Sequence, residues 1–222
     1  MALGPFGAVY LADNQRLLSN LDGGSIWQQT PTWRAEAGTA TTILVSEGRS
    51  DGSFDPTQSQ VLLGTAGGYV LRLPSALANH WEESRLLTQG AVTLLAEAAA
   101  QPSFVYAWGQ GALFASTNAG ASWTTVPYSV EGVGPVARST AADGAEAQAL
   151  VVADDDPATV YLALAGTGVI VSHDSGLTWR PLSGGLRHGG VHALTFDRRS
   201  GNYLLAATDQ GIWRFPLRPA TR

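Results

Sequence analysis

Short runs of hydrophobic residues recur along this chain, separated by clusters of Gly, Asp, Asn and Pro. Residues 149–182 give the clearest example, with predicted strands at 149–153, 159–163, 169–171 and 179–182. Brief apolar runs bounded by turn residues are typical of β-strands, whereas a helix would need a longer stretch with a 3.6-residue period. The pattern therefore predicts an all-β chain of short antiparallel strands.

The same succession of strands recurs, so the chain divides into repeated four-stranded units. We place five units at approximately residues 6–30, 41–87, 91–127, 147–183 and 190–216 of a single domain. The first unit lacks an inner strand and the last lacks a fourth strand. Residues 2–6 are a candidate edge strand for the last unit, which would close a ring; the alternative is a part of a larger assembly of such units.

An octet motif marks the end of the third strand in three of the units. Its frame is Ser/Asn, any, Asp/Asn, any, Gly, any, Thr/Ser/Ile, Trp. The frame residues are Asn20, Asp22, Gly24 and Trp27 in the first unit, Ser116, Asn118, Gly120 and Trp123 in the third, and Ser172, Asp174, Gly176 and Trp179 in the fourth. In the second unit the motif has decayed, although Trp81 keeps the last position.

Each position of the octet has a structural purpose. A short Asp or Asn side chain accepts hydrogen bonds from nearby backbone N–H groups and holds a tight turn. The Gly supplies a positive φ, and the Trp buries a large ring while keeping one N–H donor. We therefore expect the octets to hold turns and to have no catalytic role.

On these motifs the chain resembles the Asp-box, or BNR, repeat family of β-propellers, which includes sialidases, xyloglucanases, sortilin-type receptors and photosystem assembly factors. The resemblance implies a β-propeller of four-stranded antiparallel blades, about five in number, with incomplete first and last blades. It also implies that the boxes are structural and lie between the third and fourth strands of a blade.

The composition limits the kinds of partner and the location that we expect for the protein. The net charge of −5 argues against nucleic acid or an anionic membrane as partner. Charged residues make up only 14% of the chain, and it contains arginine but no lysine. No apolar run reaches the length of a membrane span. The chain has no cysteine and its N-terminus does not resemble a secretory signal, so we expect either a cytoplasmic protein or one whose leader has been removed.

Candidate catalytic groups have ordinary structural explanations. Arg72-Leu73-Pro74 resembles the Arg-x-Pro motif of sialidases, but it follows an outer-half strand of the second unit instead of preceding the first box. The acidic run 154–157 fits a solvated turn, and Glu82 and Glu83 fit a solvated strand edge. The four histidines show no metal-ligand spacing, so we expect neither a metal nor a cofactor.

A binding surface is the remaining candidate. In a propeller, the turns between second and third strands share a face with the links between blades. That face would carry an aromatic and arginine-rich rim, a composition favoured at protein interfaces. The rim residues are Trp33, Arg34, Trp108, Gln110, Arg187 and His188, with the loop 129–146 beside them.

The sequence thus favours a non-catalytic binding or scaffolding module for a protein or glycan, with self-association through incomplete blade edges as a further possibility. The alternatives are a glycoside-hydrolase-like enzyme of sialidase or glycanase type, or an inactive remnant of one, and a part of a larger propeller or sensor. Fold similarity alone does not separate these alternatives.

Overall fold

The computed structural model describes residues 1–3, 8–13, 15–21, 25–46, 59–75, 77–87, 89–130, 146–182, 190–197 and 203–217. Within these ranges the chain forms twenty β-strands and one short 3₁₀ helix, η2 (Ala35–Ala37). No helix of the described ranges is long and apolar enough to cross a membrane. The prediction of an all-β chain is confirmed.

The strands form five sheets, which we call blades one to five in chain order. Blades one and two contain β1 (Ala2–Leu3), β2 (Val9–Asp13), β3 (Arg16–Asn20) and β4 (Gln28–Gln29), then β5 (Ala40–Val45), β6 (Val61–Thr65), β7 (Tyr69–Leu73) and β8 (Glu82–Arg85). Blade three contains β9 (Leu94–Ala98), β10 (Gln101–Gly109), β11 (Ala112–Ser116) and β12 (Thr124–Val126). Blades four and five contain β13 (Ser129–Val130), β14 (Ala147–Val152), β15 (Val160–Leu164), β16 (Gly168–Ser172) and β17 (Thr178–Pro181), then β18 (Val191–Phe196), β19 (Tyr203–Thr208) and β20 (Gly211–Pro216).

Two short strands differ from what the sequence predicted. β1 pairs antiparallel with β2, with Ala2 opposite Tyr10, so it supplies the inner strand of blade one. The expectation that the N-terminal segment serves the last blade was therefore wrong. β13, from the predicted loop 129–146, runs parallel to β17 and covers the outer edge of blade four.

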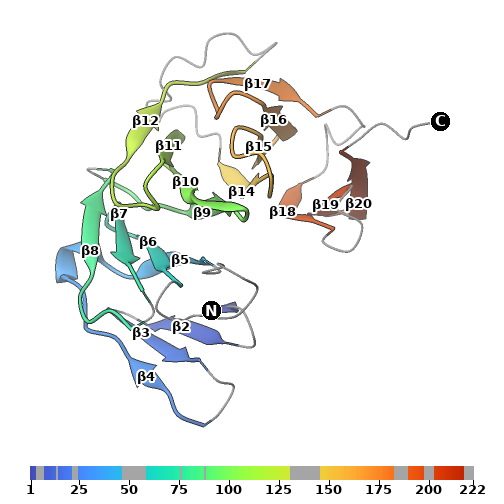
Figure 1. Cartoon of the computed structure of the whole chain (residues 1–222). Helices are drawn as coiled ribbons and strands as arrows, with labels where there is room; N and C mark the ends of the chain where they lie inside the picture. The colour runs from blue at the N-terminus through green and yellow to red at the C-terminus, as the bar shows by residue number, and fades with distance from the viewer. Residues whose placement is uncertain are drawn as a thin grey trace.

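The blades follow one another around an arc, with their inner strands toward its centre (Figure 1). Four clusters of buried apolar side chains hold the arc together, and each cluster lies between two consecutive blades. Alternation along a strand explains this arrangement, because successive side chains point to opposite faces. In β6, Leu62 packs toward blade three and Leu63 toward blade one, and both are fully buried.

Burial on both faces explains why β6, β15 and β16 consist mostly of apolar residues. All five residues of β6, β15 and β16 are buried. The outermost strands β4, β8 and β12 are polar and largely exposed. Among the described residues no apolar cluster joins blade five to blade one, and Figure 1 shows these blades on either side of the opening in the arc.

Candidate functional site

The octet turn of blade four is closed by one hydroxyl and one carboxylate. Ser172 Oγ accepts hydrogen bonds from the backbone N–H groups of Asp174 at 3.3 Å and Gly176 at 2.9 Å. The Asp174 carboxylate accepts the backbone N–H of Thr178 at 2.8 Å and the Ser172 hydroxyl at 2.7 Å. The Trp179 indole donates to the carbonyl of Gly176 at 2.8 Å. All of these contacts lie within the turn itself.

Blade three has the same network with an amide in place of the carboxylate. Ser116 Oγ accepts the backbone N–H groups of Asn118 at 3.3 Å and Gly120 at 2.9 Å. Asn118 Oδ1 accepts the backbone N–H of Ser122 at 2.9 Å, and Trp123 donates to the carbonyl of Gly120 at 3.0 Å. Since a neutral amide serves as well as a carboxylate, the network depends on hydrogen-bond geometry and does not require a charge.

In the octets of blades three and four, which we call boxes, the fourth residue adopts a left-handed conformation, with φ of 58° at Ala119 and 62° at Ser175. Its N–H reaches across its own blade to a carbonyl near the start of the second strand, that of Ser103 at 2.8 Å or Ala158 at 2.9 Å. The box therefore ties the end of the third strand to the beginning of the second.

The box glycines of blades three and four pack against the preceding blade. A Cβ placed on Gly176 would lie 2.5 Å from Cδ2 of Leu113 in blade three, and one placed on Gly120 would lie 2.8 Å from Cδ2 of Leu62 in blade two. Cβ contacts this short are essentially absent from real structures, so an alanine at either position would force the leucine to move and would also strain a backbone of positive φ. Box geometry and blade packing are thus coupled.

The box of blade one is only partly described. Asn20 is buried at the end of β3, and Trp27 is partly exposed. Asp22 and Gly24 lie outside the described residues, so their expected roles in the turn stay predictions.

Arg72 connects blade two to the box of blade three. Its Nε donates to the carbonyl of Ala119 at 3.0 Å and to Gln60 Oε1 at 3.3 Å, and its Nη1 contacts Glu82 Oε2 at 2.6 Å. The guanidinium is thereby held among protein acceptors. Nearby, Glu83 forms an ion pair with Arg34. Both glutamates of the β8 edge therefore have arginine partners.

Two of the proposed rim residues, Trp33 and Trp108, lie in the core and not at the surface. Trp33 is buried in the cluster between blades one and two, where it packs edge-on against Trp81 at 5.6 Å between ring centroids. Trp108 is buried in the cluster between blades three and four, beside Tyr128 at 5.8 Å. Because both indoles belong to the apolar core, they offer no ring to a partner, and this part of the hypothesis is corrected.

The other rim residues are dispersed or undescribed. Arg34 is exposed and paired with Glu83, whereas Gln110 lies in the β10–β11 turn against the backbone of Gly90. Arg187 and His188 lie outside the described residues.

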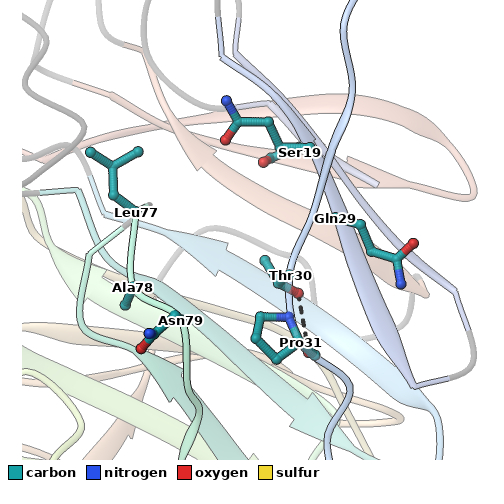
Figure 2. A pocket seen from close by; sticks show the side chains of 8 residues that line it. Ser19, Gln29, Thr30, Pro31, Leu77, Ala78 and Asn79 are labelled. Atoms are coloured by element: carbon teal, nitrogen blue, oxygen red, sulfur yellow. Dashed lines mark hydrogen bonds between the residues drawn. The ribbon is translucent and has the colours of Figure 1, made fainter.

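A groove that sequence reasoning missed lies between blades one and two. It has a volume of about 500 Å³ and is lined by Ser19, Gln28, Gln29, Thr30, Pro31, Leu77, Ala78 and Asn79. Figure 2 shows Leu77 and Gln29 on opposite sides of this groove. One side is the outer strand β4 and the residues that follow it, and the other is the decayed octet of blade two. Two sequence features could have indicated this groove. One is the uncharged polar pair Gln28-Gln29 after Trp27, and the other is the loss of the octet motif in blade two.

The floor of the groove is held by hydrogen bonds. Thr30 Oγ1 donates to the carbonyl of Leu17 at 3.2 Å and accepts the backbone N–H of the same residue at 3.3 Å. The Trp81 indole donates to the carbonyl of Pro31 at 2.7 Å. Backbone and side chains therefore fix the floor before any ligand arrives, while Gln28, Gln29 and Leu77 remain exposed at its margins.

Charged groups elsewhere are engaged in local contacts. Asp156 accepts hydrogen bonds from Thr159 Oγ1 at 2.6 Å and from the Ala158 N–H at 3.1 Å, which is turn chemistry. His192 contacts Asp209 at 2.5 Å, and hydrogen bonds from His192 and the Gly190 N–H lower the pKa of Asp209. Within the described ranges, no group of three His, Asp or Glu side chains is arranged to hold a metal ion.

Comparison with solved structures identifies the fold as a β-propeller. The GH74 enzyme of Niastella koreensis superposes with a TM-score of 0.67 at 15% identity, covering 97% of this chain and 35% of that chain. YCF48 from Cyanidioschyzon merolae gives 0.64 at 14%, covering 97% and 65%. A chain of a mitotic checkpoint complex gives 0.66 at 12%, covering 97% and 59%.

The chain thus spans less than two thirds of the length of each of these structures. No protein-family model and no curated protein matches its sequence. Propellers that resemble it include an enzyme and proteins of other kinds, so the fold leaves the activity open.

Proposed function

We propose that this chain is a non-catalytic propeller of the Asp-box type that binds an extended segment of a partner protein in the groove between blades one and two. The observation that carries the proposal is the groove itself. A preformed floor meets exposed amide side chains on one side and Leu77, which is 56% exposed, on the other.

The groove has the chemistry that a peptide backbone needs. Gln28, Gln29 and Asn79 each present amide donors and acceptors, which can pair with the N–H and C=O groups of an extended chain. β4 is also the outermost strand of its sheet among the described residues, so a segment could add beside it as a further strand. Leu77, Pro31 and Ala78 provide apolar contact for alternate side chains.

The groove does not suit hydrolysis. None of the described residues that line it carries a carboxylate, and glycoside hydrolysis commonly uses a pair of them. Arg72, the arginine of the sialidase-like motif, instead forms hydrogen bonds with the box turn of blade three and with Glu82. These contacts support binding over catalysis.

A glycan is the second candidate ligand. A GH74 enzyme is among the similar structures, and the amide side chains of the groove would also pair with sugar hydroxyls. A peptide is favoured because a β-edge and an exposed leucine suit a backbone with apolar side chains.

The experiment is a selection from a displayed library of random peptides, run beside a glycan array and a hydrolysis panel of sialosides and β-glucans. Selected peptides should lose binding to Leu77→Asp and to Gln29→Ala. They should keep binding to Leu177→Asp, a matched control at a leucine 48% exposed in the box of blade four. Binding that survives both groove variants would refute the groove, and hydrolysis abolished by changing one carboxylate would refute the non-catalytic assignment.

A further inference from the structure

The face of blade five that points away from blade four is built like a core face but is uncovered. Ile212 lies on β20 opposite Ala207, the position that Val169 occupies on β16 opposite Ala163. Val169 is 4% exposed because blade five covers it, whereas Ile212 is 80% exposed. The equivalent residues of blades one, two and three are Leu17, Val70 and Leu113, and all three are buried against the following blade.

The neighbouring residues of this face follow the same rule. Ala193 and Ala207 are exposed in blade five, while their counterparts Ala149 and Ala163 are buried in blade four. Small side chains at these inner positions allow another sheet to approach closely. We call the face formed by Ala193, Ala207, Ile212 and Arg214 the leading face.

Arg214 adds a polar contact suited to a box. It follows Ile212 by two residues, as Arg72 follows Val70 in blade two. Arg72 uses this position to hold the box turn of the next blade through the carbonyl of Ala119. Arg214 instead lies over the ring of Tyr203, 4.1 Å from its centroid, and is exposed. The leading face therefore offers both the apolar and the cationic parts of a blade junction.

The opposite end of the arc presents the complementary face. Trp27 occupies the last position of the octet in blade one, and its counterpart Trp179 is 2% exposed because it packs against blade three. Trp27, with no blade before it in the structure, is 44% exposed. Leu11 and Leu18 are half-buried, whereas their counterparts Leu162 and Ile170 are fully buried. We call Leu11, Leu18 and Trp27 the trailing face.

We infer that the leading face of one copy docks on the trailing face of a second copy, in a head-to-tail contact that reproduces the junctions within the chain. At each of the four junctions within the chain, the leading face of one blade packs on the trailing face of the next blade through an apolar cluster. The two free faces at the ends of the arc are of these same two kinds, so they are suited to pack on each other. The chain's own blade one does not cover blade five, since Ile212 and Trp27 are exposed and Figure 1 places their blades across the opening. A contact between two different faces is heterologous and can add further copies.

The experiment measures the assembly state of the full chain by sedimentation velocity over a concentration series. The wild type should self-associate in a concentration-dependent way, and Ile212→Glu or Trp27→Glu should each weaken that association at least about tenfold, because a buried charge replaces an apolar anchor. Leu177→Glu, at an exposed leucine away from both faces, should associate as the wild type does. Thermal melting of every variant checks that it is folded.

Mixing the two blocked variants gives the sharper test. Ile212→Glu keeps a free trailing face and Trp27→Glu keeps a free leading face, so together they should form a dimer that grows no further. A wild type that stays monomeric, as ring closure within one copy would make it, overturns the inference. So does a mixture that forms no dimer while the wild type associates. Neither result bears on peptide binding in the groove.

Discussion

Nε of Arg72 donates a hydrogen bond of 3.0 Å to the carbonyl oxygen of Ala119, so a side chain of blade two holds the box turn of blade three. The same guanidinium contacts Glu82 at 2.6 Å on the neighbouring strand of its own blade. Box turns are thus stabilised from within by Ser and Asp or Asn side chains and, at this junction, from the preceding blade as well.

Replacing Arg72 by leucine should lower the free energy of unfolding by about 1–3 kcal/mol, because the Ala119 carbonyl and Gln60 would lose a charged donor. Urea denaturation measures the change. Arg180→Leu, at an exposed position of β17, should stay within about 0.5 kcal/mol of the wild type. Equal effects of the two substitutions would argue against the inter-blade role of Arg72.

The box glycine should tolerate a methyl group less well than a glycine in open space. Gly176 and Gly166 both have positive φ, 91° and 73°, but a Cβ would meet Leu113 at the first and nothing within 4 Å at the second. Both alanine variants carry the backbone strain, while only Gly176→Ala also forces repacking, so it should be less stable than Gly166→Ala by about 1–3 kcal/mol. Thermal or urea unfolding of the pair tests this difference, and similar stabilities would contradict the tight packing.

The stability of the protein at acidic pH should depend on the carboxylate of Asp174 in the box of blade four. Desolvation alone would raise the pKa of Asp174, but hydrogen bonds from Thr178, Ser172 and the Leu177 backbone outweigh it and lower the pKa. A lowered folded-state pKa contributes stability above the ordinary value of 3.8, and this contribution is lost as the pH falls through the lower folded-state pKa.

Asp174→Asn should therefore reduce the loss of stability below about pH 4 while keeping the fold, since Asn118 already serves in blade three. Unfolding curves measured from neutral pH down to acid compare the two proteins. An unchanged acid dependence would mean that the carboxylate does not titrate with folding.

The octet tryptophans Trp179 and Trp27 should contribute differently to the free energy of unfolding. Trp179→Ala should cost about 3–5 kcal/mol, because a fully buried ring leaves a cavity between blades three and four. Trp27→Ala should cost far less, since its ring is already 44% exposed. Melting curves of the two variants at low protein concentration give the comparison; a large loss at Trp27 alone would reverse the assigned packing.

Much of the fold could be predicted because its signals are local. The run 149–153 was predicted as a strand and β14 spans Ala147–Val152, and the octet spacing placed the turn at Asp174. Each strand and turn has its own pattern of apolar and turn residues, which can be recognised without knowing what the segment packs against.

Pairing over distance could not be predicted in the same way. β1 and β13 have two residues each, too few to show a period, and Ser129 pairs with Thr178 far along the chain. The burial of Trp33 and Trp108 was not predicted for a related reason. An aromatic residue near the end of a strand is equally compatible with packing in the core and with contacting a partner at the surface. The groove depends on two blades meeting, and no single segment carries its shape.

The most direct test of the central claim is a map of amide chemical shifts by NMR while a selected peptide is titrated into the folded chain. Binding in the groove predicts shifts at Gln28, Gln29, Leu77 and Asn79, with the box amides of Gly120 and Gly176 unchanged. Shifts centred on the boxes of blades three and four, with the groove amides unmoved, would contradict the account.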